Sequence, residues 1–545
     1  MITHTIKGNI VDISRRLISL GEIIVQNGFI SSISIQNQGE VDPLLPFISP
    51  GFIDAHVHIE SSMLVPSEFA RLAVVHGTVG TVSDPHEIAN VCGIQGVKFM
   101  IDNGKKVPFK FNFGAPSCVP ATFFETAGAV LDADEVAELL KHDDIKYLTE
   151  MMNFPGAISG DPEVIKKINA AHKIDKPVDG HAPGLRGDDL KKYVDRGIST
   201  DHECFTIEEA REKLKLGMKI IIREGSAAKN FDELIPLIES HADNIMFCSD
   251  DKHPDSLVFG HINDLCSRAV NKGYDVFNVL KAASINPILH YKLDIGMLRL
   301  GDPADFILLE NLTNFKVRAT YINGVQVSTA GHSLIERNTL NGELLNNFSC
   351  EQIKADDLKI TANKEYKSAV IGCLDGQLIT LKKNMSPRLI DEVYESDTEN
   401  DVLKIVVVNR YSPAPISKAF VNGFGLKQGA IASSVAHDSH NIVAVGVDDE
   451  SLMRAINLII RHKGGISCVA GSNEDVLNLP IAGLMSDGEG YEVALKYTEL
   501  DKKAKLLGSA LTAPFMSLSF MALLVIPHIK LSDKGLFDGD EFKLY

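Results

Sequence analysis

Two histidines that stand two residues apart, His56 and His58, are the first residues of this chain whose spacing suggests chemistry. They follow an apolar run that is typical of a β-strand. Residues i and i+2 of a strand point to the same side, so both imidazoles could bind one ion where the strand ends. An isolated pair of this kind is more often a surface feature. The remaining sequence must therefore decide between a metal site and a chance pair.

The bulk composition narrows the possible partners. The chain has 545 residues, 45% of them hydrophobic and 23% charged, which indicates a globular protein of about two to four domains. The net charge of -18 argues against binding nucleic acid or an anionic membrane surface. The first residues do not have the pattern of a signal peptide, so none is expected, and no uninterrupted run of about 18 apolar residues is present. Eight scattered cysteines without a Cys-x-x-Cys pair favour reduced thiols and a cytoplasmic location.

Residues 49–290 alternate apolar strand-like runs with amphipathic segments, the pattern of repeated βα units. We count eight such runs, the number needed for a closed (β/α)8 barrel of the TIM type: 52–58, 78–84, 109–113, 145–150, 177–181, 198–202, 218–224 and 244–250. Helices are expected between them, for example over 67–75 and 134–140. Active sites of such barrels lie at the C-terminal ends of the strands.

Two further domains are expected around this barrel. β-rich runs in residues 1–48 and 291–340 are too short to fold well separately, so we expect one small composite β-sandwich domain built from both flanks. Residues 350–545 have the size of an α/β domain. Strands are expected there over 403–408 and 442–447, and a helix with Leu452, Ile456 and Ile459 on one face should follow the second strand.

The ends of the predicted strands carry the side chains that ligate metals. Taken one by one, each histidine could be a hydrogen-bonded part of the scaffold, and Glu150 could be a buried, paired carboxylate. Closure of the barrel would bring six of these residues to one mouth: His56, His58, Glu150, His181, His202 and Asp250. Four imidazoles and two carboxylates suit two divalent ions, with one carboxylate bridging them. Such ions lower the pKa of water from about 16 toward about 7, and Asp250 could transfer the proton. The set predicts metal-assisted hydrolysis.

Several motifs resemble a known family. The segment 50–58 is similar to the opening motif of the amidohydrolase superfamily, and 301–305 resembles its second signature. Further segments resemble bacterial adenine deaminases in particular: 58–63, 83–90, 151–156, 179–184, 201–203, 248–251 and, in the C-terminal region, 423–434. The resemblance covers essentially the whole chain, and the order of the motifs is its strongest part.

This resemblance implies hydrolysis of adenine to hypoxanthine and ammonia, with two divalent ions, Mn²⁺ or Fe²⁺, on the six residues above. It also implies that Glu150 and Asp250 are catalytic, with Asp250 delivering a proton to the departing amine. Dihydroorotases and hydantoinases have a carboxylated lysine where this chain has Glu150, and Lys146 lies too early in its run to replace it. Asp251 could hold N7 of adenine, or it could be a loop or helix-capping carboxylate.

Some assignments stay open at this level. Glu60 and Glu203 are candidates for protonating N1 by adjacency alone. Asp84, His86 and Glu87 could contact substrate, support the metal ligands or bind a further ion; we expect Asp84, Asp251 and Glu203 to be substrate-binding.

His437 and His440 could form another site or be an ordinary polar loop. We expect a homo-oligomer. The competing functions are hydrolysis of another cyclic amide or amidine, and a ligand-binding barrel without activity.

Overall fold

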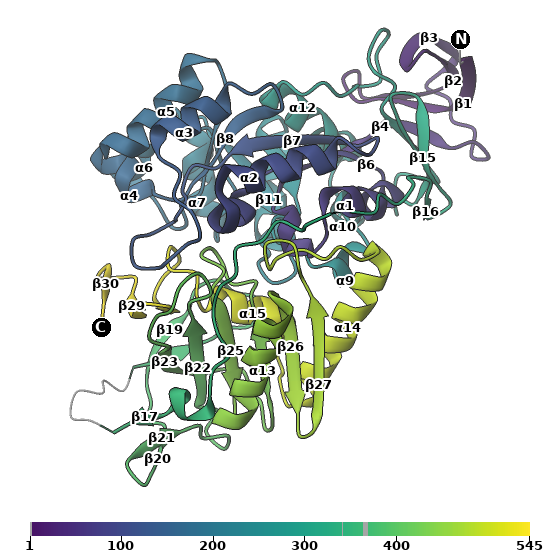
Figure 1. Cartoon of the computed structure of the whole chain (residues 1–545). Coiled ribbons are helices and arrows are strands. Elements are labelled where there is room, and N and C mark those ends of the chain that lie inside the picture. Colours follow the sequence, from purple (N-terminus) through teal and green to yellow (C-terminus); the bar gives the residue numbers. More distant parts are fainter. Residues whose placement is uncertain (1–2, 341, 363–368) are drawn as a thin grey trace.

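The computed structural model describes residues 3–340, 342–362 and 369–545. Its central part contains two parallel sheets of five and three strands (Figure 1). The first is formed by β5 (Phe52–Val57), β6 (Thr78–Ser83), β7 (Lys110–Ala115), β8 (Ile145–Met151) and β9 (Val178–Gly180). The second is formed by β10 (Thr200–Asp201), β11 (Lys219–Arg223) and β12 (Ile245–Cys248). All eight predicted runs therefore contain strands.

Single parallel bridges connect the two sheets at both of their edges. Val178 pairs with Ile198 at one junction, and Val57 pairs with Asp250 at the other. The second junction is reinforced by backbone hydrogen bonds, since the Asp250 amide donates to the His56 carbonyl at 2.9 Å and the His58 amide donates to the Asp250 carbonyl at 3.3 Å. The start and the end of this region are thus held side by side.

Helices connect the strands, as the βα pattern predicts. The helix expected over 134–140 is α3 (Ala133–Leu140), which begins with a capping box in which Asp132 accepts from the Glu135 amide and Glu135 accepts from the Asp132 amide. The helix expected over 67–75 is α1 (Pro66–Ala73) followed by one 3-10 turn. The others are α2 (His86–Gly104), α4 (Phe154–Ser159), α5 (Pro162–Lys173), α6 (Gly187–Val194), α7 (Ile207–Lys215), α8 (Phe231–Leu234), α9 (Pro254–Leu257), α10 (Ile262–Asn271), α11 (Val276–Leu280) and α12 (Asn286–Tyr291).

The flanks of this region form one eight-stranded sheet, at the upper right of Figure 1. β4 (Phe47–Pro50) and β13 (Phe306–Leu309) pair antiparallel and join the two flanks. The N-terminal flank adds β1 (Thr3–Asp12), β2 (Leu17–Gln26) and β3 (Phe29–Gln38). The C-terminal flank adds β14 (Val317–Ile322), β15 (Val325–Thr329) and β16 (His332–Ser333).

The C-terminal region contains a second eight-stranded sheet, in the order β19-β18-β23-β22-β25-β24-β26-β27. Its strands are β18 (Ala369–Gly372), β19 (Leu381–Asn384), β22 (Leu403–Val408), β23 (Ser417–Asn422), β24 (Ala430–Ser433), β25 (Ile442–Gly446), β26 (Gly465–Ala470) and β27 (Asn473–Asn478). The expected helix after β25 is α13 (Asp449–His462), which buries Leu452, Ile456 and Ile459.

Smaller elements complete this region. They are β17 (Ile360–Thr361), β20 (Arg388–Ile390), β21 (Val393–Glu395), α14 (Gly490–Leu506), α15 (Pro514–Phe520), β28 (Ile529–Ser532), β29 (Gly535–Asp538) and β30 (Lys543–Leu544). Among the described residues, we find no helix with the length and apolar character needed to cross a membrane.

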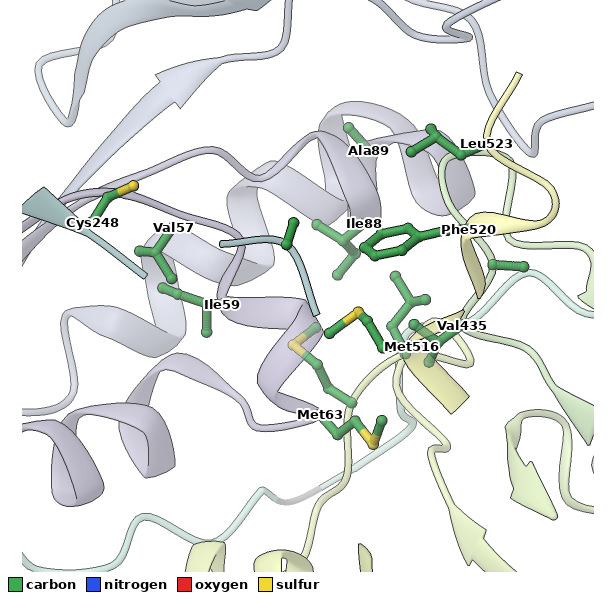
Figure 2. Close-up of a cluster of buried hydrophobic side chains, with 14 of the residues drawn as sticks. Val57, Ile59, Met63, Ile88, Ala89, Cys248, Val435, Met516, Phe520 and Leu523 are labelled. Atoms are coloured by element: carbon green, nitrogen blue, oxygen red, sulfur yellow. The ribbon is translucent and has the colours of Figure 1, made fainter. Parts of the chain in front are cut away.

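The C-terminal region packs against the ends of the parallel strands. One continuous hydrophobic cluster contains buried residues of both regions. Figure 2 shows Ile88 of α2 beside the ring of Phe520 at the end of α15, with Val435 and Met516 nearby. A further bridge links Leu64 to Ser486. The C-terminal region therefore covers the side of the central region on which the predicted ligands lie.

Candidate active site

The six side chains predicted from strand ends come together in the structure. His56 lies on β5 and Glu150 on β8, while His58, His181, His202 and Asp250 directly follow or closely follow β5, β9, β10 and β12. Each is almost completely buried, although imidazoles and carboxylates are seldom buried without partners. Five of them, with His56 the exception, line one small pocket.

Glu150 lies between three of the imidazoles. Its carboxylate oxygens lie 3.4 Å from Nε2 of His58, 2.6 Å from Nδ1 of His181 and 3.1 Å from Nε2 of His202. Burial opposes ionisation of Glu150, but His181 and then His202 hold the pKa of its carboxyl well below the usual range. An ionised carboxylate surrounded by imidazoles is suited to bridging cations.

The first strand presents two imidazole nitrogens to a shared carboxylate oxygen. Nε2 of His56 and Nε2 of His58 lie 3.1 Å apart, and Oδ1 of Asp250 is 3.5 Å from the former and 3.3 Å from the latter. The Nδ1–H of His58 donates to the Asp84 carbonyl at 3.3 Å, because a carbonyl can only accept. Nε2 of His58 is therefore the ring nitrogen that faces Asp250 and His56, and it is the atom that would bind a metal.

Buried atoms without partners support the same interpretation. Nε2 of His181 is buried, and it has no hydrogen-bond partner in the part of the chain that the structure describes. A buried polar atom without a partner destabilises a fold by about 1–3 kcal/mol unless something else satisfies it. Four imidazoles and two carboxylates are a ligand set that suits first-row divalent ions, so the residues at this site fit such cations.

Arg223 is a site residue that the motifs did not reveal. From the end of β11, its guanidinium donates to both carboxylate oxygens of Glu203, at 2.9 Å for the longer contact, and to Oδ2 of Asp250 at 2.8 Å. Glu203 in turn lies 3.4 Å from Nε2 of His202. Arg223 thus holds one oxygen of Asp250 and leaves Oδ1 facing the histidines.

The predicted substrate-binding residues Asp84 and Asp251 make different contacts. Oδ2 of Asp84 is 3.0 Å from Nδ1 of His86, and Oδ1 accepts the His86 amide at 3.0 Å. Asp84 therefore holds His86, whose Nδ1 lies 3.6 Å from Glu150. Asp251 lines the pocket and accepts a hydrogen bond from the Ser61 hydroxyl at 2.5 Å.

The two candidates for protonating N1 differ in location. Glu203 lines the pocket, whereas Glu60 is not among the residues that line it. Glu60 accepts the Ile88 amide at 3.1 Å, and burial together with the charge of Glu87 raises the pKa of its carboxyl to about 7. Glu60 therefore supports the start of α2 rather than the pocket wall.

The C-terminal region contributes side chains to the same pocket. His437 and Asp438 line it together with Leu378 and Leu523. Both His437 and His440 contact Glu87 at the start of α2. Both histidines are therefore buried against a carboxylate of the central region.

Matches to known proteins extend along almost the whole chain. The model of the amidohydrolase family matches residues 47–327, and that of the adenine deaminase C-terminal domain matches residues 377–543. An adenine deaminase of Salinibacter ruber is 55% identical over 543 residues, 99% of this chain and 98% of the relative. Adenine deaminases of a Sulfurovum species and of Borreliella burgdorferi are 55% and 51% identical, each over 98% of both chains.

The chain belongs to the adenine deaminase family.

Because the chain belongs to the adenine deaminase family, the motifs of that family could be identified in its sequence. Two features of the site could not be predicted from those motifs. Arg223 is the last residue of β11 and the second-last residue of the predicted run 218–224, so its place near a strand end was the available signal. Ser61 lies in the motif 58–63, but its contact with Asp251 was not predicted, because it joins residues 190 positions apart. The C-terminal domain of this adenine deaminase family member takes part in the pocket directly, through His437 and Asp438.

Proposed function

We propose that this chain catalyses hydrolysis of adenine to hypoxanthine and ammonia. The observation that carries the proposal is identity of 50–55% with curated adenine deaminases over 98–99% of the chain, across both the central and the C-terminal regions. The buried cluster of imidazoles and carboxylates is consistent with it, since hydrolytic attack on an aromatic carbon needs an activated water.

We propose that His56, His58, Glu150, His181, His202 and Asp250 bind two divalent ions, Mn²⁺ or Fe²⁺. Support comes from the 3.1 Å approach of the two Nε2 atoms of the first strand and from the imidazoles around Glu150. When bound, such ions act as Lewis acids and lower the pKa of water, so that a nucleophile is present at neutral pH.

Asp250 moves the proton in this proposal. Water adds its oxygen to C6 of adenine, the bond between C6 and the exocyclic nitrogen breaks, and the second hydrogen of the water ends on N1 of hypoxanthine. Asp250 accepts the proton that water releases through Oδ1 and passes it to the departing amine, giving ammonia. Arg223 donates to Oδ2 at 2.8 Å and keeps the carboxylate oriented during both transfers.

Asp251 and Glu203 hold the purine in this proposal, and Asp84 supports the site indirectly. Asp251 lines the pocket beside Asp250, where it can bind N7 of adenine. Both oxygens of Glu203 already accept from Arg223, so Glu203 acts as an acceptor toward the substrate. Asp84 acts mainly by fixing His86 against Glu150.

We also infer that the eight parallel strands form one closed barrel. The bridges Val178–Ile198 and Val57–Asp250 support closure at both junctions between the sheets. Residues 49–290 would then form the catalytic barrel, 1–48 with 291–340 the composite β domain, and 350–545 the C-terminal domain. A homo-oligomer and a cytoplasmic location stay predictions.

A direct assay tests the function. Protein loaded with manganese under reducing conditions should convert adenine to hypoxanthine, followed by the change in ultraviolet absorbance, with two ions bound per chain. Absence of turnover despite two bound ions would refute the assignment. Turnover of another base in a panel of purines and pyrimidines, with adenine left unchanged, would instead favour a different cyclic amidine or amide as substrate.

A further inference from the structure

A loop of the C-terminal region, residues 434–441, reaches the pocket of the central region. His437 is 2% exposed and lines this pocket together with Glu150, Asp250 and Asp251. Its amide donates to the Ser519 hydroxyl at 3.2 Å, and its ring centroid lies 5.3 Å from that of Phe520. Ser519 and Phe520 belong to α15, which packs against α2 (Figure 2). The loop therefore has a defined position.

Glu87 holds the ring of His437 directly, and a second histidine, His440, holds Glu87. The Ala436 amide donates to Nδ1 of His440 at 3.2 Å, so Nδ1 is an acceptor and the proton of His440 is on Nε2. That Nε2–H donates to one oxygen of Glu87, and the other oxygen accepts from Nδ1–H of His437. Glu87 thus fixes the orientation of the His437 ring and holds its Nδ1–H, while His440 fixes Glu87.

This arrangement leaves one atom of His437 facing the pocket. Nε2 of His437 is buried and has no hydrogen-bond partner in the residues that the structure covers. Oδ1 of Asp251 lies 3.8 Å from this nitrogen. Such an atom at a pocket wall is available to a bound molecule.

We propose that His437 is a substrate-contacting residue that donates a hydrogen bond from Nε2 to a ring nitrogen of the purine. Glu87 and His440 are positioning residues that act through it. This inference rests on the proposed function, because a purine offers acceptor nitrogens around both rings. A fixed donor in a buried pocket discriminates strongly against a base that lacks the matching acceptor.

The charge state of His437 agrees with a donor at this atom. Burial lowers the pKa of the His437 ring, but Glu87 and then Asp251 outweigh burial and raise it to about 9. Both ring nitrogens then carry protons at neutral pH. One faces Glu87, and the other faces the pocket.

The test compares His437→Ala and His437→Gln with His462→Ala, an exposed histidine of the same region at the end of α13. Each protein is loaded with manganese and assayed with adenine and with its 1-deaza, 3-deaza and 7-deaza analogues. Loss of a hydrogen bond to a buried charged group predicts a fall in kcat/KM of about 10- to 100-fold for His437→Ala, mostly through KM. The His437→Gln variant should recover part of the loss, since its amide can donate.

The analogues decide whether the lost contact is with the purine. We expect the preference of the wild type for adenine over one analogue to collapse in His437→Ala, with the other two preferences unchanged. Unchanged kcat/KM would overturn the proposal. Equal losses for all four bases would also overturn it, as would the disappearance of a third bound ion per chain, which would show that Glu87, His437 and His440 bind metal instead.

The proposed function can fail independently. If the wild type does not convert adenine, the assignment of the activity fails, and calorimetric titration of the same variants with adenine still tests His437. An equal Kd for the wild type and His437→Ala would then overturn the inference. The His437→Gln variant serves this comparison if His437→Ala does not fold.

Discussion

At the scale of single residues, Glu150 and Asp250 have different surroundings although both are buried carboxylates. Glu150 contacts imidazoles through both oxygens. Asp250 faces imidazoles with Oδ1 and the Arg223 guanidinium with Oδ2. Removal of the Glu150 carboxylate and removal of the Asp250 carboxylate should therefore have different effects. The two variants can distinguish metal binding from proton transfer.

We expect Glu150→Ala to lose bound metal, because the histidines around it lose the anion that they share. Asp250→Asn keeps its shape and should retain at least one ion, while kcat falls by about 10²- to 10⁴-fold, the range typical of proton-transfer residues. Metal content and turnover measured on the same preparations check both. Asp102→Asn, an exposed change on α2, is the control. A fully active Asp250→Asn variant would remove Asp250 from the proton-transfer role.

At the scale of elements, the parallel strands place their C-terminal ends on one side of the central region. Other elements then hold the C-terminal region over that side. β28 does this with a buried lysine. The Lys530 ammonium donates to the carbonyls of Leu378 at 2.6 Å and Phe520 at 2.9 Å. Leu378 lines the pocket, and Phe520 packs over α2 (Figure 2).

Lys530 should make stability depend on pH. Burial lowers the pKa of its ammonium from 10.5 to about 7 in the folded protein. Between those values the unfolded chain holds a proton that the folded chain has released, so stability rises with pH, by about 1.4 kcal/mol per unit. Burial of the Lys530 ammonium destabilises the fold to the full extent below about pH 7. It has no such effect above the pKa of this lysine in the unfolded chain, 10.5.

The measurement compares apparent Tm values from pH 6 to 9. We expect the wild type to gain Tm relative to Lys530→Met as the pH rises through this range, because methionine does not titrate. Lys534→Met, four residues further on in the turn before β29, is the control. Parallel pH profiles for the wild type and Lys530→Met would show that Lys530 keeps an ordinary pKa.

At the scale of the whole molecule, the central and C-terminal regions share one hydrophobic core at the pocket. Ile88, Phe520 and Met516 belong to a single cluster (Figure 2). Polar contacts continue the interface, since Glu68 and Glu489 both bind Arg71 and the Gly490 amide donates to Glu68. Removal of a large side chain here should therefore affect both stability and activity.

We expect Phe520→Ala to lower the free energy of unfolding by about 3–5 kcal/mol, as deletion of buried aromatic rings does. Its kcat/KM should also fall, because the His437 ring lies against Phe520. Thermal unfolding and turnover are the measurements, and Phe123→Ala, whose side chain is 88% exposed, is the control. Loss of stability without loss of activity would show that the interface is structural only.

Local patterns in the sequence determined much of the fold. The strand runs 52–58 and 244–250 and the helix after Asp448 depend on the spacing of apolar residues and on capping groups within a few positions. The metal-ligating side chains at the strand ends could be identified from the sequence for the same reason. Parallel strands bring those ends to one side without further information.

Only the tertiary structure decided which of these side chains meet residues of other elements. Arg223 holds Glu203 and Asp250 because β11 packs between β10 and β12. His437 meets Glu87 across 350 positions of the chain because two regions share a hydrophobic core. No local period encodes a contact between separately folded elements. It arises when their apolar faces are buried together.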